Sequence, residues 1–248
     1  MNGETRSAWL PYCGSAPIPA DLLGRWNLDP PLLAGLCAGT FLLWHATEGR
    51  RNRQLATAAV GVTLLLFVSP FCALSSALFS ARVTHHVLLA AVLAPLLAHA
   101  VPERRSRLPG SLALWTGLQA AAFWFWHAPG PYSQALSSDL IYWVMQLTIL
   151  GTAVGFWAAL RHASGPSSIA ALLVSTVQMG LLGALITFAG APFYAPHFLT
   201  TEAWGLTPLE DQQLAGLIMW APSAALYLAA ALIVAQRWFA REERELAA

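Results

Sequence analysis

Three side chains that can carry charge or bind a metal stand near the start of one apolar run, "SARVTHHVLLAAVLAPLLAHAVP", residues 80–102. Arg82 and His86 are four residues apart, so on a helix they share one face, and His85 lies close to that face. Because adjacent residues diverge by about 100° on a helix, His85 and His86 cannot both point at one centre. Ionisable groups are costly if such a run crosses a membrane, and there they mark a functional site or a buried polar pair.

Sulfur and imidazole side chains elsewhere in the chain bring a second kind of chemistry, metal binding. The chain has seven histidines, four methionines and three cysteines. Thioether, thiolate and imidazole donors together favour copper, particularly Cu(I). Each donor also has a plainer interpretation, since an interfacial histidine often only hydrogen-bonds near lipid headgroups and a methionine at helical spacing more often fills a core.

The composition indicates that membrane helices carry these residues. Of 248 residues, 57% are hydrophobic and 10% are charged, whereas a soluble domain has about 25% charged residues. The mean hydropathy is +0.56, and a net charge of +1 gives no reason to expect nucleic-acid binding. No cleavable signal peptide is recognisable, and the cysteines follow no CxxC spacing and imply no disulfide framework.

The apolar stretches predict seven spans. A helix needs about 20 apolar residues to cross about 30 Å of hydrocarbon. The stretches that meet this need lie at about 31–47, 55–76, 84–101, 111–127, 139–160, 168–189 and 211–236. We therefore expect an all-α integral membrane protein, a seven-transmembrane helix bundle. Its parts are an outer tail at 1–30, the membrane domain at 31–236 and a tail at 237–248.

Arginine placement predicts the orientation, because cytoplasmic loops are enriched in basic residues. One side receives Arg50, Arg51, Arg53, Arg104, Arg105, Arg107, Arg161, Arg237, Arg241 and Arg244. The other side receives only Arg6, Arg25 and Arg82, so we expect the N terminus outside and the C terminus in the cytoplasm. The copper donors that fall on the outer side are then His85, His86, His127, His197, Met145, Met219, Cys13 and Cys72.

Three segments of the chain together resemble a known family. They are "SPFCALSSALFSARVTHHVLLAAVLAPLLAHAVP", "FWFWHAPGPYSQAL" and "LLGALITFAGAPFYAPHF…GLTPLEDQQLAGLIMWAPSAALYL", of which "TPLEDQQLAGLIMW", residues 207–220, is the most specific. They are similar to the multi-spanning CtaG-type cytochrome c oxidase assembly factors of bacteria. The resemblance implies a multi-pass protein of the bacterial plasma (inner) membrane. Its partners would be the lipid bilayer and oxidase subunits or other assembly factors, and its role the maturation of haem-copper oxidases, with copper handling.

The resemblance also implies site residues. In the family's pattern the third span opens with two histidines four residues apart; here the second corresponds to His86, whereas Arg82 stands at the first. In the fifth span, where the family often has histidine, this chain has Met145 and Gln146. The remaining family positions are His127, Asp211, Gln212, Gly216, Met219 and Trp220.

We expect a copper site formed by His86, His127 and Met219. A polar cluster would support it, and further ligands would be available nearby. The expected supporting residues are Arg82, His85, Asp211, Gln212 and Trp220, and the expected additional ligands are Cys72, Met145 and His197. A purely structural polar cluster remains the alternative to a metal site.

The expected function is that of an assembly factor for a haem-copper cytochrome c oxidase, with Cu(I) bound or presented at the outer face. We expect no enzyme, because no nucleophile–base–orienter set and no glycine-rich phosphate loop is recognisable. Two other classes stay open. A transporter would use Arg82, Asp139 and Asp211 along an ion path, and a haem-binding redox protein would use His86 and His127 as axial ligands. The client oxidase and the oligomeric state stay open.

Two expectations concern structure directly. Arg82 should pair with Asp211 across the third and seventh spans, so that its charge does not face lipid, while His85 points elsewhere. If a disulfide forms, it should join Cys13 to Cys72, the two cysteines on the oxidising outer side.

Overall fold

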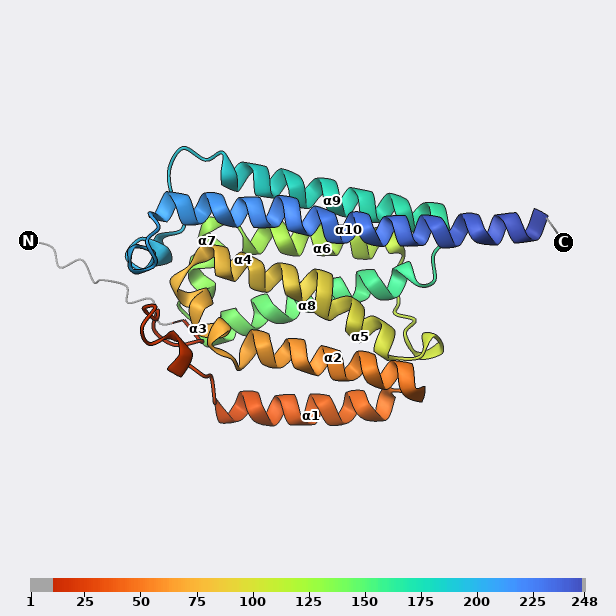
Figure 1. Ribbon diagram of the computed structural model, residues 1–248, viewed down its shortest axis with the longest axis horizontal. Coiled ribbons are helices and arrows are strands. Elements are labelled where there is room, and N and C mark those ends of the chain that lie inside the picture. The colour runs from red at the N-terminus through yellow and green to blue at the C-terminus, as the bar shows by residue number, and fades with distance from the viewer. Residues whose placement is uncertain (1–10, 247–248) are drawn as a thin grey trace, which may run out of the picture.

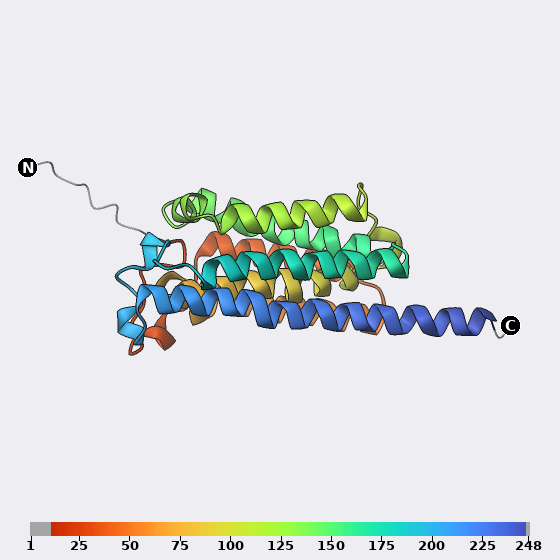
Figure 2. The same cartoon turned by 90° about the horizontal axis from the view of Figure 1, so that it is seen from above.

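The computed structural model of the chain describes residues 11–246, and within that range every regular element is a helix and none is a strand. The helices are α1 (Pro30–Ala46), α2 (Gly49–Phe67), α3 (Pro70–Ala77), α4 (Phe79–Leu88), α5 (Ala94–Ala100), α6 (Leu112–Trp126), α7 (Pro129–Ala135), α8 (Asp139–Leu160), α9 (Gly165–Thr187) and α10 (Pro208–Leu246). A five-residue π-helical segment, η2 (Leu89–Leu93), joins α4 to α5 without a break. The long helices lie side by side in one bundle (Figures 1 and 2), so the all-helical prediction is confirmed.

Four helices are long and apolar enough to cross a membrane. They are the continuous helix Phe79–Ala100, α8, α9 and α10. The pair α2 and α3 would make a fifth span, bent by 45° at its break. The number of candidate spans is therefore four to five where the sequence predicted seven, because α1 has 17 residues and α6 has 15, fewer than an untilted span requires.

Small residues bring α9 and α10 into close contact. A Cβ atom added to Gly216 would lie 2.6 Å from the carbonyl oxygen of Gly183, and one added to Gly183 would lie 2.7 Å from the carbonyl oxygen of Gly216. Neither position has room for a side chain, so the two backbones approach as closely as small-residue helix interfaces in membranes do. This contact fixes α10 against α9.

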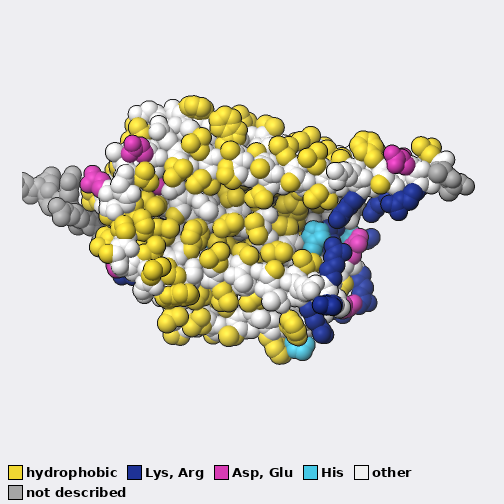
Figure 3. Space-filling view, viewed as in Figure 1, with side chains coloured by type: hydrophobic (Ala, Val, Ile, Leu, Met, Phe, Trp, Pro, Cys, Tyr) yellow, Lys and Arg dark blue, Asp and Glu magenta, His cyan; other side chains and the backbone are white. Residues whose placement is uncertain are grey.

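The two ends of the bundle differ in charge. Arginine side chains gather at the end where α10 terminates, and the flank of the bundle is largely apolar (Figure 3). We call this the arginine-rich end and the opposite one, where α4, α8 and α10 begin, the arginine-poor end. The tail predicted to start at 237 is, up to Leu246, an unbroken continuation of α10. Arg6 and the first ten residues of the predicted outer tail lie outside the described residues.

Candidate functional site

A group of polar side chains is buried at the arginine-poor end. Arg82, His85 and His86 of α4 have no exposed surface, and His127 has 2%. They lie among other buried polar residues from α7, α8 and the loop after α9. We define the polar cluster as Arg82, His85, His86, His127, Tyr132, Tyr142, Gln146 and His197.

His86 and His127 form the closest pair of metal-binding groups in the cluster. The distance from His86 Nδ1 to His127 Nε2 is 3.3 Å, and the two rings are nearly perpendicular. His127 directly follows α6, and its Nδ1 lies 2.7 Å from the carbonyl oxygen of Phe123. That carbonyl can only accept, so Nδ1 carries the proton and the Nε2 lone pair of His127 faces His86. The structure thus brings together the two histidines expected from the sequence.

The geometry of this pair fits a shared ion. Two nitrogens bound at about 2.0–2.1 Å to one tetrahedral ion lie about 3.3–3.4 Å apart. The same separation also fits a direct hydrogen bond between the rings. Over residues 11–246, no three His, Cys, Asp or Glu side chains come together as a ligand group, so the donors of the expected set that remain as a third ligand are thioethers. Met145 and Met219 are fully buried, on helices that pack against α6 and α4 respectively.

The expected ion pair between Arg82 and Asp211 is wrong. Asp211 instead caps the N terminus of α4, where its carboxylate accepts from the backbone N–H of Phe79 at 2.6 Å and of Ser80 at 3.2 Å, and from the Ser80 hydroxyl. The helix is interrupted at Leu78, where the extended backbone (φ −123°, ψ 131°) separates α3 from α4. A helix N terminus has unsatisfied N–H groups and a positive dipole, and a buried one attracts the nearest carboxylate.

Arg82 therefore has a different environment from the one expected. Its guanidinium carbon lies 5.2 Å from the centroid of the Tyr142 ring, a cation–π distance. Its Nε, Nη1 and Nη2 atoms have no hydrogen-bond partner among the described residues, and no carboxylate of residues 11–246 lies within ion-pair distance. The side chain is a buried cation whose charge nothing in the described part of the chain balances.

His85 points away from the pair of His86 and His127, as expected because adjacent residues diverge on a helix. Its ring packs edge-on against Phe67, with centroids 5.0 Å apart, and lies 6.2 Å from the ring of Phe71. Both ring nitrogens are buried and have no partner within the described range. His85 and His86 thus serve different sides of α4.

His197 is held by a tyrosine. The hydroxyl of Tyr132 lies 2.6 Å from His197 Nε2. Burial lowers the pKa of His197 to about 3 and raises the pKa of Tyr132, so the tyrosine donates to a neutral imidazole. The loop that carries His197 covers this end of the bundle, where Tyr194 stacks on Phe79 with ring centroids 3.6 Å apart. His197 is thus already engaged as an acceptor, which removes Nε2 as a metal ligand.

Besides Asp211, two residues expected to support the site lie outside the polar cluster. The Gln212 side chain accepts from Phe193 N–H at 2.7 Å and donates to the carbonyls of Ile186 and Ala191 at 3.3 Å, which fastens the loop between α9 and α10. Trp220 is 43% exposed and packs beside Gly183 of α9. On α10 Gln212 lies about 100° and Trp220 about 180° around the helix from Asp211, so the three side chains leave on different faces.

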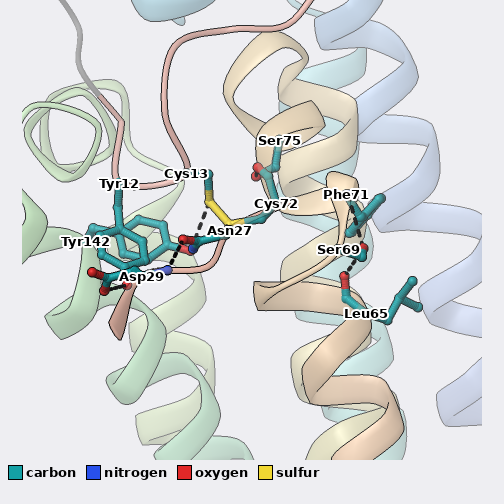
Figure 4. The surroundings of a disulfide bond; sticks show 10 residues. All are labelled: Tyr12, Cys13, Asn27, Asp29, Leu65, Ser69, Phe71, Cys72, Ser75 and Tyr142. Atoms are coloured by element: carbon teal, nitrogen blue, oxygen red, sulfur yellow. Dashed lines mark hydrogen bonds between the residues drawn. A yellow bond between two sulfur atoms is a disulfide. The ribbon is translucent and has the colours of Figure 1, made fainter. Parts of the chain in front are cut away.

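A disulfide between Cys13 and Cys72 closes the outside of the cluster, and the expected pairing is confirmed (Figure 4). Cys13 Sγ lies 3.6 Å from the Tyr142 hydroxyl, and the Tyr12 ring stacks on the Tyr142 ring with centroids 5.0 Å apart. The N-terminal segment, 11–29, is thereby fastened over Tyr142 and, beyond it, Arg82. Cys72, expected as an additional ligand, is in the disulfide and offers no thiolate.

Tyr132 and Tyr142 were not anticipated from the sequence. Tyr142 and Gln146 are one helical turn apart and both are buried in α8, so their spacing on a predicted span was the signal that could have found them. Tyr132 lies in the short helix α7, between two predicted spans, where no periodic pattern marks it.

A sequence comparison identifies a family to which the chain is similar. The sequence model of the family described as cytochrome c oxidase caa3 assembly factor (Caa3_CtaG) matches residues 41–241. The matched region contains every residue of the polar cluster. No curated protein and no solved structure matches the chain. Because the match spans most of the sequence, the chain belongs to the cytochrome c oxidase caa3 assembly factor family.

Proposed function

We propose that the protein is a non-catalytic membrane factor that takes up Cu(I) at its outer side and presents it to a haem-copper oxidase during assembly. Family membership supports the role in oxidase assembly. The observation that carries the copper part is the 3.3 Å separation between His86 Nδ1 and His127 Nε2. In this proposal copper is cargo, received and handed on.

The donor set suits transient binding of Cu(I). His86 and His127 would supply two neutral imidazole nitrogens and Met219 a thioether, a soft and uncharged set that favours Cu(I). The hydrogen bond from His127 Nδ1 to the Phe123 carbonyl would hold the ring with Nε2 toward the ion. With Cys72 in a disulfide, no thiolate would bind the ion, so it could pass to a stronger site on the client.

We further propose that all seven predicted segments cross the membrane, with the arginine-poor end outside. The segments α1 and α6 are apolar and end at polar residues, and a thin or locally adapted bilayer accommodates short spans. Reporter fusions to the loop at 102–110 would test this, because Arg104, Arg105 and Arg107 should hold it in the cytoplasm. An outside location of that loop would reverse the assigned orientation.

The copper proposal is tested by metal content and maturation together. Protein purified with its disulfide intact and loaded with Cu(I) in the absence of oxygen should hold about one ion per chain, and His86→Ala or Met219→Leu should lower that occupancy several-fold. His45→Ala, at an exposed histidine of α1, is the control and should keep it. In cells the same site variants should lower oxidase activity more than oxidase polypeptide. Unchanged copper occupancy in His86→Ala, with a folded protein, would refute the copper site and leave the assembly role intact.

The 3.3 Å distance between His86 Nδ1 and His127 Nε2 also argues against the haem alternative. Axial nitrogens on opposite faces of a haem iron are about 4 Å apart, with the porphyrin between them. Nitrogens at 3.3 Å with rings in contact leave no room for a macrocycle. A Soret band in purified protein would contradict this reasoning.

A further inference from the structure

Arg82 is buried without a counter-charge, and this needs an explanation. The side chain has no exposed surface, and all three guanidinium nitrogens lack a partner over residues 11–246. The hydroxyls of Tyr132 and Tyr142 lie near the guanidinium, but they are neutral, and a buried charge without a counter-charge is strongly unfavourable. The contact with the Tyr142 ring offsets only part of that cost. Something further must stabilise the cation in the folded protein.

The carboxylates near this end are occupied by other donors. Asp211 receives two backbone N–H groups and a hydroxyl at the start of α4. Asp29 accepts from the hydroxyl of Tyr12 at 2.5 Å and caps α1. Asp139, at the start of α8, is exposed. None of the three therefore neutralises Arg82.

Unpartnered polar atoms continue from Arg82 one helical turn further along both helices. On α4 the next turn carries His85, whose two ring nitrogens are unpartnered. On α8, Gln146 follows Tyr142 by four residues, so it lies one turn below the ring that contacts the guanidinium. Both amide atoms of Gln146 are buried and unpartnered as well. Arg82 and Gln146 thus present unpartnered buried donors on either side of the Tyr142 ring position, one helical turn apart.

We propose that this region is a binding site for a small monovalent carboxylate, held by Arg82 with help from Gln146. A planar guanidinium matches a carboxylate through two parallel N–H···O bonds, and the Gln146 amide adds a neutral donor. The anion balances the one uncompensated buried charge of the cluster. This site stands without copper; if Cu(I) does bind at His86, four residues along the same face, the anion also relieves its repulsion from Arg82.

Formate is the probe, because it is the smallest carboxylate. Full-length protein in detergent is unfolded by heat and followed by tryptophan fluorescence, with sodium formate exchanged for sodium gluconate at constant ionic strength. Wild-type protein should gain several degrees in Tm, saturating with formate concentration, as binding to the folded state requires. Arg82→Gln should show no formate-specific gain. Arg161→Gln is the matched control, since that guanidinium donates to the carbonyls of Ala98 and Val101 and should leave the gain unchanged.

Two further variants keep the test decisive. Arg82→Lys keeps the charge but loses the planar guanidinium that binds a carboxylate through two hydrogen bonds. It should bind ¹³C-formate roughly tenfold more weakly, measured by NMR line broadening. It serves if Arg82→Gln fails to fold. Glu4→Gln tests a carboxylate from the chain itself: a formate response that appears only in Glu4→Gln would mean an internal counter-ion and overturn the proposal. Equal responses of wild type and Arg82→Gln, or no response in any variant, would also overturn it, whatever the copper experiment shows.

Discussion

At the arginine-rich end, Glu48 lies 2.5 Å from Arg104 and 3.4 Å from Arg105, with half or more of the arginine side-chain surface exposed to solvent. At the arginine-poor end, Arg82 is fully buried and no residue of 11–246 pairs with it. The charges at the arginine-rich end are satisfied by their neighbours and by water. Such exposed charges suit roles in membrane topology and solubility. Arg82 is buried away from water, and its donors stay free for the anion that we propose.

Removing the Asp211 carboxylate should have the largest effect on stability. Asp211→Ala leaves two backbone N–H groups and a hydroxyl buried without an acceptor, which should cost about 3–5 kcal/mol. Asp211→Asn keeps one acceptor oxygen and should lose less. At the other end, Glu48→Ala should cost about 1 kcal/mol or less, because its ion pairs are exposed.

Thermal unfolding of the three variants measures this contrast. Equal losses for Asp211→Ala and Glu48→Ala would contradict the distinction between a buried and an exposed carboxylate.

Loss of the disulfide should have the second-largest effect on stability. It links residues 59 apart in sequence, so Cys13→Ser should cost about 2–4 kcal/mol by freeing the unfolded chain. It should also loosen the N-terminal segment over Tyr142, which faster proteolysis before residue 30 would reveal. Cys37→Ser, at the exposed cysteine of α1, is the control. Mass spectrometry that finds Cys13 and Cys72 both as free thiols in non-reduced protein would contradict the bond itself.

Acid should destabilise the arginine-poor end through His197. Burial lowers the pKa of His197 from 6.5 to about 3, so between these values the unfolded chain binds a proton that the folded protein does not. Stability is therefore lost as the pH falls through this window, by about 2 kcal/mol between pH 7 and pH 5. His197→Gln keeps an acceptor for Tyr132 and should remove much of that loss.

The measurement is the difference in Tm between pH 7 and pH 5 for wild type, His197→Gln and the exposed control His45→Gln. Acid sensitivity that is the same in all three would show that His197 is not the group responsible.

The positions of several helices were readable from the sequence. The apolar stretches predicted the helices to within a few residues for α1, α8 and α9, because apolar length and polar boundaries are local properties of a membrane segment. The pairing of Cys13 with Cys72 followed from placing both on one side of the bundle. His86 and His127 could be expected near each other for the same reason.

Only the tertiary structure decided which neighbour each polar group meets. Helical spacing says that Arg82 and His86 share a face, but not which helix that face meets, so Asp211 was assigned to the wrong partner. The break at Leu78 lies within an apolar and small-residue stretch with no glycine or proline at the break to mark it, and it created the helix N terminus that Asp211 caps. Burial of an unpaired Arg82 was equally unreadable, since it depends on Tyr142 of α8 and on a loop and a disulfide that fold over it from distant parts of the chain.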